Sequence, residues 1–115
     1  MVAELTGMEV VNASHYDGAT SMAEAAIMAM NISNMKRRKV VVSPSVHPQY
    51  RKVLRTYIPD TSVTITGDED LNNDLDALKG MLDKDTACLI VQNPDFFGQL
   101  VDINGLADEV HAAGA

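Results

Sequence analysis

Three short polar stretches carry residue types that could bind a ligand. The first, residues 16–21, reads YDGATS and leads into an Ala- and Met-rich segment that is typical of a helix. Main-chain amides exposed at the N-terminus of a helix, with small side chains and hydroxyl groups beside them, can hold a phosphate. The stretch matches neither a Walker loop nor a G-x-G-x-x-G fingerprint. Its local chemistry therefore favours an ordinary capped turn, with phosphate binding as the alternative.

The second stretch, residues 43–48, reads SPSVHP and follows a continuously apolar segment that is typical of a buried strand. Ligands of open α/β sheets bind beyond the carboxyl ends of the strands. An imidazole at such a place, here His47, could stack on a planar cofactor or carry protons. It could equally cap a helix that begins at Pro48, and the sequence leaves both interpretations open.

The third stretch, residues 92–98, reads QNPDFFG and follows another apolar strand-like segment. A loop with two aromatic rings, two amides and a glycine suits the wall of a cofactor site or a contact between subunits. Alternatively, Phe96 and Phe97 fill the core of a folded loop. A mixture of these two roles is the favoured interpretation.

The remaining chemically active side chains indicate no reaction. His15 and His111 have no partner that the sequence makes visible, and no spacing of His, Cys and carboxylates suggests a metal site. The nucleophile-elbow pattern G-x-S-x-G is absent. Cys88 is the single cysteine and lies in an apolar run, which predicts a buried structural thiol in a reducing compartment.

Net charge argues against two classes of partner. The chain has 115 residues, with 16 acidic and 9 basic side chains and a formal net charge of -7. Nucleic acids and anionic membranes need a basic face, so neither is expected to bind. The one basic run, residues 36–39, follows a predicted helix and is interpreted as helix termination in solvent rather than a phosphate patch. No apolar segment is long enough for a membrane span, and Glu4 interrupts any signal-like start, so a cytoplasmic location is expected.

Strand-like and helix-like segments alternate along the chain. The strand-like segments are β-branched or continuously apolar, namely 8–13 (the weakest), 40–42, 62–66 and 86–91. The helix-like segments are 21–32, with Ser21 and Glu24 spaced as a capping box, 48–57, one marked by Leu75, Leu78 and Leu82, and one marked by Leu106 and Val110 with Gly114 as C-cap. Such alternation predicts right-handed βαβ units, a mainly parallel sheet and an α/β fold.

Both ends of this pattern look incomplete. Residues 1–7 are interpreted as the last turn of a helix that Gly7 ends, and the chain stops where a further strand is expected. Residues 68–73, with three consecutive acidic side chains, are expected to form a surface loop. Residues 1–115 are therefore predicted to be a single fragment of a larger domain, and residue chemistry alone indicates an α/β domain that could bind a ligand.

Several motifs in this order resemble a known family, the P-protein of the glycine cleavage system, and within it glycine dehydrogenase (decarboxylating) subunit 1. The matching stretches cover essentially the whole chain: 4–8 (ELTGM), 12–14 (NAS), 16–20 (YDGAT), 23–25 (AEA), 36–39 (KRRK), 47–50 (HPQY), 92–94 (QNP) and 96–98 (FFG). The resemblance implies part of the large domain of a fold-type I transferase that depends on pyridoxal phosphate (PLP).

The resemblance also implies positions for a cofactor. The turn that would hold the PLP phosphate corresponds to Gly18, Ala19, Thr20 and Ser21. His47 would lie near the ring-stacking position, and Asn93 would lie near the ring hydroxyl. No catalytic residue is implied, because none of the five lysines lies on a loop like that of the Schiff-base lysine. No metal ligand is implied either.

Subunit 1 of this family is understood as the half that supports the catalytic subunit 2. The resemblance therefore implies a part of the enzyme that decarboxylates glycine with PLP and passes the aminomethyl group to the lipoyl H-protein. The cofactor would be bound mainly by the partner subunit, the assembly would be an oligomer, and the isolated chain would be inactive. The alternatives are a phosphate- or PLP-binding module and an independent PLP-dependent enzyme of the aminotransferase type.

Overall fold

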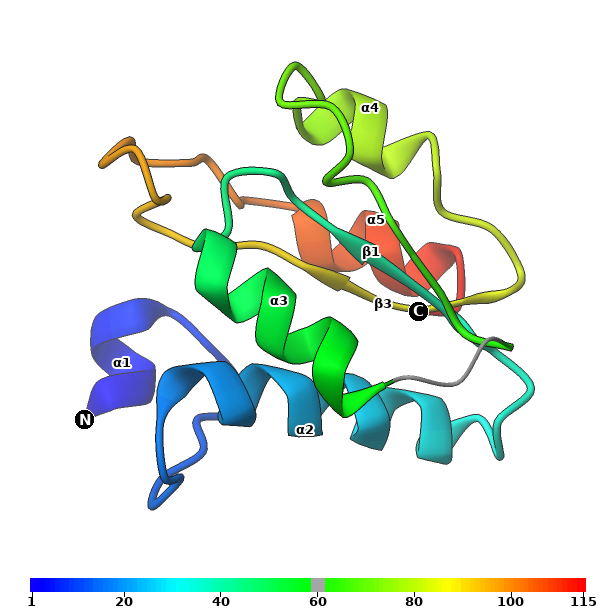
Figure 1. Ribbon diagram of the computed structural model, residues 1–115. Coiled ribbons are helices and arrows are strands. Elements are labelled where there is room, and N and C mark those ends of the chain that lie inside the picture. Colours follow the sequence, from blue (N-terminus) through cyan, green and yellow to red (C-terminus); the bar gives the residue numbers. More distant parts are fainter. Residues whose placement is uncertain (59–61) are drawn as a thin grey trace.

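A computed structural model describes residues 1–58 and 62–115 of the chain. Its centre is a sheet of three parallel strands in the order β2-β1-β3, formed by Thr64–Thr66, Lys39–Val42 and Thr86–Ile90. Helices cover both faces of this sheet, as Figure 1 shows. The predicted α/β class with a parallel sheet is therefore confirmed.

The central strand β1 explains how the two layers of helices are held. Its three valines are fully buried, as a parallel strand covered on both faces requires. Val40 and Val42 belong to the main core with residues of α2 and α3, whereas Val41 faces the opposite side, where Leu78 of α4 lies. The helices α2 (Gly18–Ile32) and α3 (Pro48–Tyr57) therefore pack on one face of the sheet.

The opposite face carries two shorter helices. These are α4 (Leu75–Lys79), at the top of Figure 1, and α5 (Leu106–Ala112), which lies behind the strands in that view. The predicted helix through Leu82 is too long, because α4 ends at Gly80, a poor helix former. Gly114 ends α5 as predicted: it follows the C-cap Ala113 with a left-handed φ of 89°, and its amide donates to the His111 carbonyl oxygen at 2.9 Å.

The start of α2 differs from the prediction. This helix begins at Gly18, three residues before the predicted Ser21, and its N-cap is Asp17. The capping box of Ser21 and Glu24 is wrong, because the Asp17 carboxylate already accepts the amide of Thr20. Glu24 instead lies 3.4 Å from a ring nitrogen of His15.

The other element boundaries follow the sequence with one exception. Strands 62–66 and 86–91 are shortened to β2 and β3, and α3 begins at Pro48 as predicted. Pro59, which was expected to lie just past that helix, is outside the described residues. The helix α1 (Val2–Thr6) ends at Gly7, as predicted. The weak strand 8–13 is wrong: these residues are exposed, and no described strand pairs with them.

The basic run 36–39 does more than end a helix. The Arg37 guanidinium donates to the carbonyl oxygens of Thr86 and Ala113 at 2.9 and 3.1 Å. The Lys39 ammonium lies 2.9 Å from an Asp83 carboxylate oxygen. Termination in solvent is therefore wrong for these two side chains. Arg37 joins the segment before β1 to the first residue of β3 and to the end of α5, and Lys39 joins the first residue of β1 to the turn before β3.

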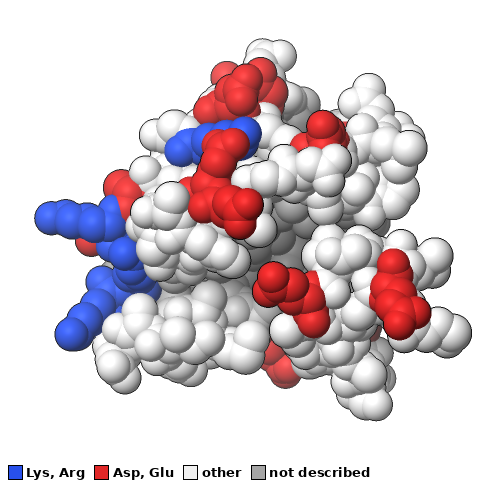
Figure 2. Space-filling model, turned by 180° about the vertical axis from the view of Figure 1, so that it is seen from behind, with Lys and Arg blue, Asp and Glu red and all other residues white. Residues whose placement is uncertain are grey.

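Charge is unevenly spread over the surface. Figure 2 shows most Lys and Arg side chains of that face gathered at one edge, with acidic side chains scattered over the rest. The basic run ends at Lys39, the first residue of β1, so it lies at the amino ends of the strands, away from the carboxyl ends where ligands of such sheets bind. Among the described residues, no helix is long and apolar enough to cross a membrane.

Candidate functional site at the carboxyl ends of the strands

Three of the six predicted site residues line one cavity of about 470 Å³. They are Gly18 at the start of α2, His47 at the start of α3 and Asn93 after β3. The remaining lining residues are mostly apolar: Met22, Val46, Tyr50, Ile90, Val91, Gln92 and Pro94. The other predicted site residues, Ala19, Thr20 and Ser21, continue the first turn of α2 and do not line this cavity.

A carboxylate lies at the amino end of α2. An Asp17 carboxylate oxygen accepts from both the Thr20 amide and the Thr20 hydroxyl, each at 2.8 Å. The hydrogen bond from the Thr20 amide, followed by that from the hydroxyl, lowers the pKa of Asp17 below its usual value of 3.8. The first turn of this helix therefore has an ionised N-cap, which also suits the positive end of the helix dipole.

Tyr50 is a cavity residue that was not predicted as one. A Cβ atom added to Gly18 would collide with the Tyr50 hydroxyl and lie 3.0 Å from the ring carbon that carries it. The glycine is therefore required by the close approach of this ring rather than by a special backbone angle. The spacing of His47 and Tyr50, one helical turn apart, was the available signal, because such residues share a helix face.

His47 caps α3. One of its ring nitrogens accepts from the Gln49 amide at 3.1 Å, and its main-chain amide donates to the Gln92 side chain at 2.9 Å. The ring stacks on Tyr50 with centroids 5.0 Å apart and meets the ring of Phe96 edge-on at 5.0 Å. Of the two interpretations left open by the sequence, helix capping is the one that the structure shows.

The side chains of Asn93 and Asp95 hold the loop after β3 in place by accepting hydrogen bonds from its main-chain amides. Asn93, which precedes a cis peptide bond to Pro94, accepts from the Val101 amide at 3.0 Å. The Asp95 carboxylate accepts from the amides of Phe97 and Gln99. The two Phe side chains do not fill the core, since they are 47% and 63% exposed, so the core-filling interpretation is wrong.

A second cavity of about 350 Å³ lies beside this loop. Its walls come from the three loops that follow the strands, and its polar lining includes Ser43, Ser45, Asn72, Asn73, Asp74, Gln92, Asp95 and Gln99. Neither cavity is lined by a lysine or an arginine. Within residues 1–58 and 62–115, no group of His, Cys, Asp or Glu could hold a metal ion.

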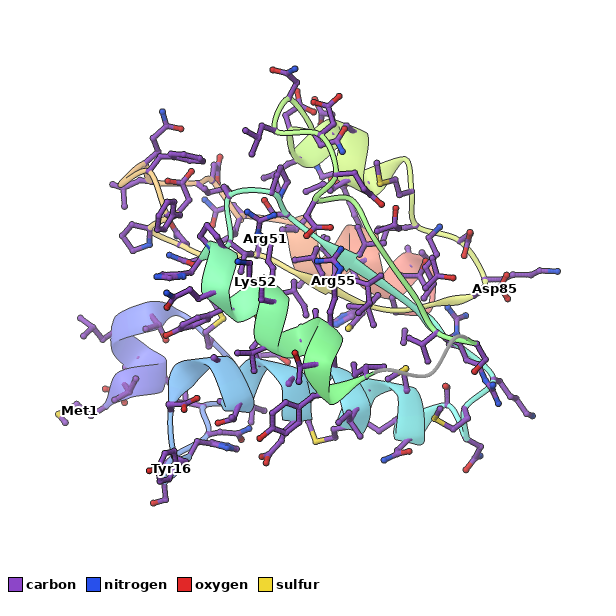
Figure 3. All side chains as sticks on the ribbon, in the orientation of Figure 1. Met1, Tyr16, Arg51, Lys52, Arg55 and Asp85 are labelled. Atoms are coloured by element: carbon purple, nitrogen blue, oxygen red, sulfur yellow. The ribbon has the colours of Figure 1, made fainter. Side chains whose placement is uncertain are left out.

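An ion cluster supports the loop between β2 and α4. Asp68, predicted to lie in a surface loop, is only 8% exposed. Its carboxylate oxygens lie 2.7 Å from Arg55 and 3.2 Å from Arg51, and both arginines reach it from α3 (Figure 3). Burial would raise the pKa of Asp68, but the hydrogen bonds from Arg55 and Arg51 outweigh it and hold the pKa below its usual value.

The single cysteine is not a reactive group. Cys88 in β3 has a free thiol, and burial raises its pKa to about 11. The thiol therefore stays protonated at neutral pH and is a poor nucleophile. This agrees with the structural role that the sequence predicted.

The sequence as a whole identifies the family. The family model described as glycine cleavage system P-protein matches residues 1–115. The chain belongs to the glycine cleavage system P-protein family. The resemblance seen in the motifs is therefore confirmed over the full chain.

Two bacterial proteins with curated names are similar to the whole chain. The chain is 47% identical over 117 residues to the probable glycine dehydrogenase (decarboxylating) subunit 1 of Moorella thermoacetica, with 100% of this chain and 26% of the relative covered. It is 49% identical over 114 residues to the protein of the same name from Rhodospirillum rubrum, with 99% and 25% covered. The chain thus spans about a quarter of the length of these relatives.

A solved P-protein structure has the same fold. It is a crystal structure of glycine decarboxylase (P-protein) of the glycine cleavage system in inhibitor-bound form. The TM-score is 0.79 at 38% sequence identity, covering 99% of this chain and 25% of the solved one. The arrangement of parallel strands and helices described above is therefore that of part of a P-protein.

Proposed function

We propose that this chain is a segment of a P-protein subunit 1 and that its parent enzyme takes part in glycine decarboxylation. In this reaction glycine loses its carboxylate as CO₂, and its aminomethyl group passes to the lipoyl arm of the H-protein. PLP, bound mainly by subunit 2, supplies the electron sink for the decarboxylation. The observation that carries the proposal is the match to subunit 1 proteins over the full length of the chain.

The residues of this chain do not fit PLP as a cofactor of their own. No lysine lines the cavity beside Gly18, so this cavity offers no amine for a Schiff base. The amide and hydroxyl of Thr20, in the position expected to hold the phosphate, are already engaged by Asp17. We therefore assign this segment a supporting role, in which it shapes the dimer interface and the entrance to a site on subunit 2.

The predicted site residues keep their positions in this proposal without binding the cofactor. Gly18, His47 and Asn93 support it because they line one cavity although they come from three separate loops. We regard them, with Ala19, Thr20 and Ser21, as counterparts of a cofactor site whose present function is structural. His47 capping α3 and Asn93 holding the loop through Val101 are consistent with that role.

The proposal includes partners and a location. The assembly contains subunit 2, engages the lipoyl H-protein and is oligomeric, and we place it in the cytoplasm. The net charge of -7 supports binding to proteins rather than to nucleic acid or anionic membranes. It does not by itself select the partner protein.

A segment exchange tests this function. The matching segment of Moorella thermoacetica subunit 1 is replaced by this chain, and the exchanged subunit is combined with subunit 2, H-protein and PLP. Glycine decarboxylation is then compared with that of the native pair. Because the two segments are 47% identical over 117 residues, we expect a rate within about tenfold of the native rate, which corresponds to at most about 1.4 kcal/mol in transition-state free energy.

The exchange has a clear control and a clear contrary result. The control is an exchange that also carries Leu54→Asp, which places a charge in the core and should abolish the fold and the rate together. An exchanged subunit that folds and binds subunit 2 but leaves the rate more than about a hundredfold below native would contradict the proposal.

A second candidate is a module that binds phosphate or PLP without a covalent bond. The cavity of about 470 Å³ beside Gly18 is the observation that favours it. Titration of PLP into the chain, followed by absorbance and melting temperature, separates the two candidates. Saturable stabilisation that is lost in both Thr20→Ala and Ser21→Ala would favour the binding module over the supporting role.

A further inference from the structure

The amino end of α2 has the general form of an anion site but already contains an anion. An α-helix of 15 residues presents its unpaired amides and the positive end of its dipole at this place. The Asp17 carboxylate takes the Thr20 amide and also the Thr20 hydroxyl, so one internal group uses both donors of that residue. The main-chain oxygen of the same aspartate accepts the Ser21 amide at 3.1 Å.

The negative charge of Asp17 disfavours binding of a phosphate at this end of α2. A phosphate ester carries about -1.5 to -2 charges at pH 7. Brought to the Thr20 amide, it would lie within a few ångströms of an ionised carboxylate, and like charges at that distance repel even in water. No lysine or arginine lines the adjacent cavity to offset this repulsion.

The Tyr50 side chain also limits the space at the amino end of α2. The Tyr50 ring lies so close to Gly18 that even a methyl group on that glycine would collide with it. The ring is held in position by stacking on His47, which in turn meets Phe96 edge-on. The first residue of the helix therefore faces a fixed aromatic ring.

We propose that Asp17 is an internal substitute for a phosphate, so that the amino end of α2 excludes phosphate-bearing ligands. The exclusion of phosphate would explain why this segment supports the enzyme without binding the cofactor, and in this respect the inference rests on the proposed function. Replacing one carboxylate should then be enough to give the turn a measurable affinity for phosphate. Asp17 is thus a specificity-determining residue that acts by exclusion.

The experiment uses the 115-residue chain and two probes, inorganic phosphate and PLP. The readout is the backbone amide NMR signals of Thr20 and Ser21 during titration at constant ionic strength. Two variants are compared with the unaltered chain: Asp17→Gly, which frees the Thr20 donors, and Asp17→Asn, which keeps a capping oxygen without its charge. Asp74→Gly is the matched control, because Asp74 caps α4 in the same way with a 2.9 Å bond to the Ala77 amide.

We expect no saturable shift of these two signals in the unaltered chain or in Asp74→Gly. In Asp17→Gly or Asp17→Asn we expect saturable shifts with phosphate affinity at least about tenfold higher, because a repelling unit charge has been removed. Equal binding by the unaltered chain, or no gain in either folded variant, would overturn the proposal. Neither outcome would alter the rate in the segment exchange, so the failure of this inference is distinguishable from failure of the proposed function.

Discussion

Gly18, the first residue of α2, lies close to the Tyr50 ring of α3. In an open helix, replacing glycine by alanine would stabilise the chain by up to about 1 kcal/mol. Here the added methyl group meets the Tyr50 ring, which stacking on His47 keeps in place. We expect Gly18→Ala to lower the free energy of unfolding by about 1–2 kcal/mol, as overpacking does.

A double-mutant cycle checks that this loss comes from the collision. Replacing the ring by Tyr50→Ala removes the contact, so Gly18→Ala should become neutral or stabilising in that background. Urea unfolding of the four chains measures the coupling. If Gly18→Ala destabilised the chain equally with and without the Tyr50 ring, the close approach would not be the reason for the glycine.

At this scale the sequence predicted positions better than interactions. Gly18, His47 and Asn93 meet at one cavity, as the resemblance implied. Asp17 was missed as the N-cap because Ser21 and Glu24 offered a formally better capping pattern that starts four residues later. Asp68 was missed as a buried ion because its partners lie 13 and 17 residues earlier, on a helix whose orientation the sequence does not show.

The helix α3 and the loop after β2 are joined by the ion cluster of Arg51, Arg55 and Asp68. Removing one arginine leaves a carboxylate that is almost fully buried with a single partner. We expect Arg55→Ala to lower the free energy of unfolding by about 1.5–3 kcal/mol, the range for hydrogen bonds to charged groups.

Lys52 is the matched control for that change. It lies on the same helix, and its side chain is exposed (Figure 3). Lys52→Ala should change the free energy of unfolding by no more than about 0.5 kcal/mol, as is usual for surface positions. Equal effects of the two substitutions in urea unfolding would argue against a structural role for the cluster.

Acid should weaken the ion cluster of Arg51, Arg55 and Asp68. The pKa of Asp68 in the folded chain lies below its usual value of 3.8, so folding favours the ionised form. The resulting stability is fully present above the unfolded pKa and is lost as pH falls through the folded pKa. We therefore expect the unfolding midpoint in urea to fall as the pH is lowered below the usual Asp value of 3.8, and to fall less steeply in Arg55→Ala. Parallel pH profiles for the two chains would contradict this.

Element types were largely predictable because their signals are local. The continuous valines of β1, Pro48 at the start of α3 and Gly7 at the end of α1 each act within a few residues. Residues 8–13 have a strand-like composition, but a strand forms only where another pairs with it, and that depends on distant segments. The same limit explains why the order β2-β1-β3 had to come from the structure.

The molecule as a whole exposes apolar surface and open strand edges. Both outer strands, β2 and β3, have one edge unpaired among the described residues. Large apolar side chains exposed by more than three-fifths are Met1, Leu5, Val10, Tyr16, Ile32, Leu71, Phe97 and Leu100. Open edges and apolar patches favour association.

We expect the isolated chain to self-associate as its concentration rises, measured by light scattering. A monodisperse monomer at all concentrations would show that the exposed apolar side chains and open strand edges do not drive association.

At the scale of the assembly, we propose that this chain supports a reaction whose cofactor is bound by another subunit. The most direct test is to titrate subunit 2 into a fixed amount of the exchanged subunit 1 and to follow the rate of glycine decarboxylation. We predict no reaction without subunit 2 and a rate that reaches its plateau when the two subunits are equimolar. Decarboxylation by the exchanged subunit 1 alone, or a rate that is the same whether or not it is present, would contradict the account.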